Sequence, residues 1–167
     1  CPNRLLKSAC TEGLGDFENR VTERHLNLYR MWAGSGAGIL VSGNILVDRR
    51  FLERGGNVSI DKDYPHTYDE QQRGMLKKWA EVSKSQGAVF IAQLNCAGLK
   101  SPAYATDITI GPVAQEKGVV PPGSAHRKRE DAAEARPATV EDLDSLVEKW
   151  IHAAVVLSEC GWDGVPV

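Results

Sequence analysis

A glutamine near the end of an apolar segment is the residue in this sequence best suited to binding a ligand. In "AVFIAQLN" (88–95), Val89, Ile91 and Gln93 share one face by the two-residue period of a strand, and the residues between them share the other. The Gln93 amide carries both a hydrogen-bond donor and an acceptor. The residues alone leave two interpretations open: a contact to a ligand with complementary polar groups, or a polar cap at the end of a strand.

Cysteine and histidine are spaced in a way that predicts neither a metal centre nor a catalytic cluster. The four cysteines, Cys1, Cys10, Cys96 and Cys160, include no CxxC pair, whereas a zinc site needs ligands at short spacings. We therefore expect reduced thiols rather than a disulfide pair. The four histidines are expected to be packed or solvated: His25 and His152 within helices, His66 before a helix and His126 in a charged loop.

Composition favours one soluble globular domain. The chain has 167 residues, 42% hydrophobic and 25% charged, with a formal net charge of -2. That charge gives no reason to expect nucleic acid or an anionic membrane as a partner. No apolar run reaches the roughly 20 residues that span a bilayer. The first residues, "CPNRLLKSAC", lack the apolar core of a signal peptide, and together with the expected reduced thiols this predicts a cytoplasmic location.

Strand and helix patterns alternate along the chain. Buried strands are expected within 3–11, 37–47 and 88–95, and a fourth begins in 162–167. Helices are expected to begin after the N-caps Thr22, Asp69 and Thr139, and Gly87 and Gly161 are expected to end the second and third. This order predicts an α/β fold with parallel strands joined by right-handed crossovers. The long segment 96–137 after the third strand is expected to be a functional loop.

Two further patterns concern the first two helices and the turn after the first. The apolar side of the first helix is expected to contain Leu26, Tyr29, Met31 and Trp32. That of the second helix is expected to contain Met75, Leu76, Trp79 and Val82. The "GSGAG" stretch (34–38) partly matches a dinucleotide fingerprint. That fingerprint must follow a strand and open a helix, whereas these glycines follow a helix and lead into a strand. They are therefore predicted to form a helix-to-strand turn.

Four stretches, in order and spacing, resemble the Old Yellow Enzyme family of flavin oxidoreductases. They are "NRLLKSACTEGL" (3–14), "YRMWAGSGAGILVSGNILVDRR" (29–50), "AVFIAQLNCAG" (88–98) and "ECGWDGVPV" (159–167). The resemblance implies an eight-stranded (β/α) barrel that binds FMN at its C-terminal mouth, and such barrels typically need about 250 residues. Residues 1–167 are thus expected to be the N-terminal half of a truncated TIM barrel, with three strands and the start of the fourth.

The resemblance assigns cofactor contacts to the ends of the first and third strands. It places Gln93 at the pyrimidine edge of the flavin and Thr11 near flavin O4, where a hydrogen bond would tune the redox potential. Thr11 could instead be a turn residue after the first strand. Ala9 and Cys10 match positions that give the flavin main-chain contacts. The Cys10 side chain is expected to point to the opposite face of the strand and to pack there.

The end of the second strand matches a position where a small residue lets the flavin ring approach the backbone. The expected register places Asn44 there, with Gly43 beside it, and a slip of one residue would exchange them. The sequence departs from the family at Cys96 and Leu99, where His and Arg are common. The family's substrate-binding histidine would follow Val167, so no catalytic residue is assigned.

Three functions compete. The first is an FMN-dependent NAD(P)H oxidoreductase of ene-reductase type, which reduces activated alkenes by hydride transfer. The second is a non-catalytic half-barrel that lacks the substrate-binding His and the FMN phosphate site and can self-associate through its unpaired sheet edges. The third is an aldolase-like lyase, for which Asp48 and Asp163 are poor candidates. For the structure, we expect parallel strands at Leu5–Cys10, Gly38–Ser42 and Val89–Leu94 in that order, with Gln93 on the concave face.

Overall fold

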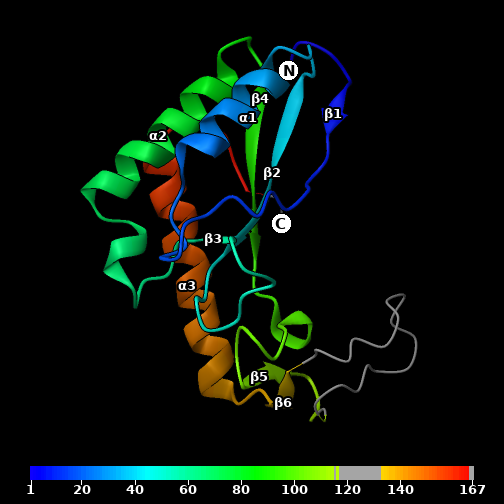
Figure 1. Cartoon of the computed structure of the whole chain (residues 1–167), viewed down its shortest axis with the longest axis vertical. Helices are drawn as coiled ribbons and strands as arrows, with labels where there is room; N and C mark the ends of the chain where they lie inside the picture. The colour runs from blue at the N-terminus through cyan, green and yellow to red at the C-terminus, as the bar shows by residue number, and fades with distance from the viewer. Residues whose placement is uncertain (115, 117–132, 166–167) are drawn as a thin grey trace.

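Parallel strands form the centre of the computed structural model, which describes residues 1–114, 116 and 133–165 (Figure 1). Strands β1 (Leu6–Lys7), β2 (Ile39–Leu46) and β4 (Val89–Asn95) lie side by side in the order of the sequence, as predicted. The short strand β3 (Val58–Ser59) pairs with the end of β2, on the same side of β2 as β1. His126 and residues 166–167, for which the sequence predicts a charged loop and the continuation of a strand, lie outside the described residues.

The beginning of the expected fourth strand lies on the free edge of β4. Gly164 forms a parallel bridge with Ile91, and its carbonyl oxygen accepts a hydrogen bond of 2.9 Å from the Ala92 N–H. The preceding Asp163 N–H donates to the Phe90 carbonyl oxygen at 3.0 Å. Among the residues that the structure describes, the sheet therefore stays open rather than closing into a barrel, and the fold is part of a (β/α) barrel.

Three helices cover one side of the sheet, and each begins where its N-cap predicts (Figure 1). They are α1 (Glu23–Ala33), α2 (Glu70–Lys84) and α3 (Val140–Glu159). The Asp69 carboxylate accepts the Gln72 N–H at 2.8 Å, and the Thr139 hydroxyl accepts the Asp142 N–H at 3.2 Å. Gly87 and Gly161, which follow α2 and α3, have φ angles of +84° and +81°, a conformation that favours glycine and ends a helix.

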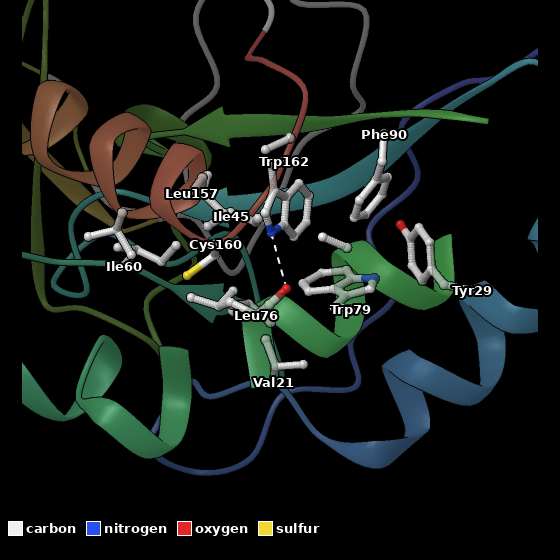
Figure 2. Packing of buried hydrophobic residues seen from close by; sticks show 14 of the residues in the cluster. Val21, Tyr29, Ile45, Ile60, Leu76, Trp79, Phe90, Leu157, Cys160 and Trp162 are labelled. Carbon is white, nitrogen blue, oxygen red and sulfur yellow. Dashed lines mark hydrogen bonds between the residues drawn. The ribbon is translucent and has the colours of Figure 1, made fainter. Parts of the chain in front are cut away.

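Aromatic side chains fill the space between sheet and helices (Figure 2). Phe90 of β4 stacks on Trp162 with ring centroids 4.0 Å apart, and Trp79 of α2 lies edge-on to Trp162 at 5.0 Å. The Trp162 indole N–H donates to the Leu76 carbonyl oxygen at 3.3 Å, so its polar atom is satisfied in the core. This packing joins the segment before Gly164 to α2 and β4.

Three local predictions differ from the structure. The first strand spans only Leu6–Lys7, because the chain from residue 8 onward leaves the ladder and passes close to β2. Met31 is exposed rather than packed, since it follows the buried ring of Tyr29 by two positions, on another side of α1. The segment 96–137 contains the 3-10 helix η2 (Gly98–Lys100) and a parallel pair of strands, β5 (Ile108–Gly111) and β6 (Glu134–Pro137). A second 3-10 helix, η1 (Pro65–Thr67), precedes α2.

Candidate functional site

A bulge in β2 decides which residue lies beside Gln93. The register between β2 and β4 shifts by one residue at Ser42–Gly43, so that Asn44 is the partner of Gln93. The Ser42 hydroxyl donates to the Gly43 carbonyl oxygen at 2.8 Å and accepts the Gln93 backbone N–H at 3.0 Å. A bulge re-aims the side chains that follow it, and here it brings the Asn44 and Gln93 side chains to neighbouring positions.

Gln93 lies half-buried on the face of β4 that points away from the helices. The alternate residues Phe90, Ala92 and Leu94 are buried in the core, which confirms the predicted assignment of faces. The side-chain amide of Gln93 makes no hydrogen bond to any other residue that the structure describes. Its donor and acceptor are therefore both available to a ligand on this face.

Sequence reasoning missed the residue that joins two of the predicted contacts. The Thr11 hydroxyl donates to Oε2 of Glu53 at 2.8 Å, and the Asn44 side-chain amide donates to the same oxygen at 2.6 Å. A carboxylate that accepts two hydrogen bonds holds both donors firmly. Glu53 thus fixes Thr11 and Asn44 next to each other, close to Gln93 through the pairing of Asn44. Glu53 lies in an irregular loop, where no periodic pattern of residues in the sequence could identify it.

Gly43 is required by contacts within the chain itself. Its N–H donates to Oε1 of Glu12 at 2.8 Å, and the Tyr29 hydroxyl donates to the same carboxylate oxygen. A Cβ atom at Gly43 would lie 2.6 Å from the Cys10 carbonyl oxygen. Burial, together with the neighbouring Glu12 carboxylate, raises the pKa of Tyr29, so its hydroxyl stays protonated and acts as a donor.

Ala9 and Cys10 lie in the irregular segment between β1 and the Glu12 contact. Ala9 is half-buried, whereas Cys10 is exposed, so the prediction that the Cys10 side chain packs against the strand is wrong. Because β1 ends at Lys7, the alternation of faces no longer applies at these positions. Their main-chain contacts to a flavin remain predictions.

These residues fit the edge of a flavin ring best at Gln93. The free amide there can donate to a ring carbonyl and accept from the ring N3–H. Glu53 uses the Thr11 hydroxyl donor and one of the two Asn44 amide N–H donors. A ligand would therefore meet the Thr11 oxygen, the Asn44 carbonyl and the second Asn44 N–H.

A second polar cluster is buried between α3 and the loops that follow β2 and β3. The Lys149 ammonium group, fully buried, lies 2.6 Å from Asp61, 2.7 Å from Asp63 and 3.4 Å from Asp48. Burial would lower the pKa of Lys149, but the hydrogen bonds to Asp61 and Asp63 and the Asp48 charge outweigh it and raise the pKa. Arg50 also binds Asp48, through both carboxylate oxygens. Lys149 contacts all three carboxylates, so the cluster joins α3 to the loops that follow β2 and β3.

The remaining candidates for catalysis have structural roles. His25 packs 4.9 Å from the Trp79 ring, and His152 packs 4.4 Å from the Tyr68 ring. Asp163, considered for a lyase, accepts the Phe90 N–H and pairs with Lys84. All four cysteines are free. Burial, with the nearby Asp48 carboxylate, raises the pKa of Cys96 to about 11, so Cys96 stays a thiol at neutral pH.

Within the described ranges, no three His, Cys, Asp or Glu residues are grouped so that they could hold a metal ion. In the same ranges, no helix combines the length and apolar character needed to cross a membrane.

Parallel strands alternating with covering helices define part of a (β/α) barrel, and comparison with solved structures agrees. The complex of 2-naphthoyl-CoA reductase with 2-naphthoyl-CoA matches 98% of this chain and 24% of its own, with a TM-score of 0.80 and 22% identity. The Old Yellow Enzyme homologue from Zymomonas mobilis matches 98% of this chain and 43% of its own, with a TM-score of 0.78 and 19% identity. No protein-family model matches the chain.

Sequence comparison finds similar flavin oxidoreductases along the whole chain. The NADH-dependent flavin oxidoreductase iliE of Neonectria sp. (strain DH2) is 28% identical over 99% of this chain and 22% of its own length. The corresponding protein iccE of Talaromyces variabilis is 29% identical over 98% of this chain and 40% of its own. The chain therefore spans well under half the length of these relatives. The predicted resemblance to the Old Yellow Enzyme family is confirmed, and the chain corresponds to part of these longer proteins.

Proposed function

We propose that this chain supplies part of the FMN site of an NAD(P)H:flavin oxidoreductase of Old Yellow Enzyme type that reduces activated alkenes. The observation that supports it most is the free amide of Gln93 on the open face of β4, beside Asn44. Similarity to NADH-dependent flavin oxidoreductases along the whole chain supports the same class. When bound, FMN supplies the hydride-transfer chemistry between NAD(P)H and the alkene.

The residues of this chain would bind and orient the flavin. Gln93 would pair with the pyrimidine edge, and the backbone at Ala9 and Cys10 would contact the ring. Thr11 and Asn44, fixed by hydrogen bonds to one carboxylate, would lie along the same edge. Correct orientation matters because hydride transfer requires reacting atoms about 3–3.5 Å apart.

A second candidate function is a non-catalytic part of a barrel. It is favoured by the positions of His25 and His152, which pack among the aromatic rings of the helix layer rather than on the face of Gln93. A substrate carbonyl on that face would then have no imidazole from these two residues to polarise it. In this case the chain binds flavin weakly or not at all, and its unpaired strand edges favour association with a further chain.

Flavin titration tests the first proposal. FMN is added to the purified chain, and binding is followed by quenching of flavin fluorescence and by retained absorbance after gel filtration. Gln93→Leu removes one amide, and loss of a net contribution of about 0.5–1.5 kcal/mol should weaken FMN binding about 2- to 13-fold. Gln71→Leu makes the same chemical change at an exposed position of α2 and should leave the affinity unchanged.

Equal affinities of the Gln93→Leu variant and the unaltered chain would contradict the assignment of Gln93. The oxidation of NAD(P)H, measured separately with and without an activated alkene, distinguishes the two functions. Retained FMN with alkene-dependent turnover supports the oxidoreductase. Absence of retained FMN, with a folded chain by circular dichroism, supports the non-catalytic barrel segment.

A further inference from the structure

A cleft of about 860 Å³ opens between the loop that follows β1 and the loop that follows β2. The residues expected to contact the flavin are not among those that line it. Its volume lies within the range of small-molecule sites, about 300–1,000 Å³. The cleft is therefore a second candidate site, and its chemistry can be derived from its walls, its charges and its exposed rings.

The walls of the cleft are held in place by close backbone contacts. The Gly15 N–H donates to the Gly56 carbonyl oxygen at 2.8 Å and ties the two loops together. Gly56 has a φ of +79°, and a Cβ there would lie 2.6 Å from the Gly13 carbonyl oxygen. The buried amide of Asn19 donates to the Asn57 carbonyl oxygen at 3.0 Å. Loops fixed at this many points present a preformed surface rather than one that a ligand must organise.

The charge that lines the cleft is predominantly positive. Arg24, in the first turn of α1, is exposed and has no ion-pair or hydrogen-bond partner in the part of the chain that the structure describes. Arg49 is held by hydrogen bonds from its guanidinium group to the Asn19 side chain at 2.8 Å and to the Phe17 carbonyl oxygen at 3.3 Å. Neither contact neutralises its charge. The lining carboxylate, Asp16, is paired with Arg20 outside the lining at 3.1 Å.

Two aromatic rings are exposed at the same cleft. Phe17 is 103% exposed and Tyr104 is 68% exposed, and they come from segments 87 positions apart in the sequence. Leaving a phenyl ring fully in water is unfavourable, so a ligand that packs against it would remove apolar surface from water. An aromatic ring offers a flat face on which another ring can stack.

We propose that this cleft binds a ligand in which a flat ring is joined to an oxyanion, as in a nucleotide or an aromatic carboxylate. Arg24 and Arg49 bind the oxyanion, because a guanidinium group matches the geometry of phosphate and carboxylate. Phe17 and Tyr104 pack against the ring. The residues that line this cleft differ from those of the proposed flavin site, although both sets lie partly on the loops that follow β1 and β2.

Binding of defined probes to the whole chain tests this assignment. The probes are AMP and 2-naphthoate, with adenosine as the neutral counterpart of AMP, and amide chemical shifts are followed by two-dimensional NMR. We expect AMP, 2-naphthoate or both to shift residues 13–24 and 49–56. Tighter binding of AMP indicates a nucleotide ligand, and tighter binding of 2-naphthoate indicates an aromatic carboxylate.

Two variants of helix α1 distinguish binding at this site from non-specific electrostatic attraction of anions. Arg24→Gln should weaken binding of the anion about 10-fold or more, as expected for loss of a hydrogen bond to a charged group, and should leave adenosine unaffected. Arg30→Gln removes an exposed arginine that binds the Asn27 side chain. It should change neither the binding of the anion nor that of adenosine. The proposal is overturned if neither anion shifts these residues, or if both variants weaken binding equally.

Discussion

Replacing Lys149 by methionine should be among the most destabilising single changes in this chain. Lys149→Met keeps a side chain of similar length but removes the ammonium group that lies 2.6 Å from Asp61 and 3.4 Å from Asp48, both fully buried. Asp48 keeps its hydrogen bonds from Arg50, whereas Asp61 keeps no cation beside its Oδ1 atom. A carboxylate that is buried without its cation costs much more than a lost surface contact.

The magnitude follows from the burial of this ion pair. Removing one partner of a buried pair costs about 3–5 kcal/mol, a large part of the roughly 5–15 kcal/mol that stabilises a typical domain. At about 2–4 °C per kcal/mol for a chain of this size, the Tm should fall by about 6–20 °C. Thermal unfolding measures the Tm and urea unfolding measures the free energy of unfolding, both followed by circular dichroism.

Lys62→Met is the matched control. Lys62 pairs with Glu148 of the same helix α3 at 2.5 Å, but this pair lies at the surface, where water screens it. Its loss should change the Tm much less. Adding Asp61→Asn to Lys149→Met removes the stranded charge and should recover part of the stability. If Lys149→Met costs no more than Lys62→Met, the assignment of α3 docking to this buried cluster is incorrect.

Two further predictions concern acid stability and backbone packing. Burial alone would raise the pKa of Asp48, but hydrogen bonds from Arg50 and the buried ammonium charge outweigh it and lower the pKa. A carboxylate with a lowered pKa in the folded state stabilises the fold at pH values above its ordinary pKa. The free energy of unfolding should therefore decrease as the pH falls below about 4. A free energy that stays constant down to about pH 2 in a series of urea-unfolding experiments would contradict this. Gly43→Ala places a Cβ against the Cys10 carbonyl oxygen and should destabilise by about 1–3 kcal/mol in urea unfolding. Gly74→Ala, in an open position on α2, should be neutral or stabilising, and a similar loss in both variants would refute the packing argument.

Features of the structure that depend on local chemistry could be predicted from the sequence. The N-caps Thr22, Asp69 and Thr139 place the three helix starts, because capping involves residues only two or three positions apart. The period of the third strand places Gln93 on the open face for the same reason. The order of parallel strands follows from the alternation of elements together with the handedness of crossovers.

Features that depend on contacts between distant segments could not be predicted in this way. Glu53 accepts hydrogen bonds from Thr11, 42 positions earlier, and from Asn44, and neither distance produces a pattern in the sequence. The bulge at Ser42–Gly43 changes the partner of Gln93 by one residue, which strand periodicity cannot reveal. Lys149 has the spacing of an ordinary polar helix residue, so its burial becomes visible only when its carboxylate partners are in place.

The buried cluster also has a consequence for the order in which the chain can fold during synthesis. Asp61 precedes Lys149 by 88 positions, so on the ribosome the carboxylate emerges long before its cation. Until then, Asp61 lacks its cation and must remain hydrated, so the loop that carries it cannot be buried beneath a helix. The nascent amino-terminal part should therefore stay open to proteases around residues 48–61 and become protected in one late step, when α3 arrives with the charge that completes the cluster.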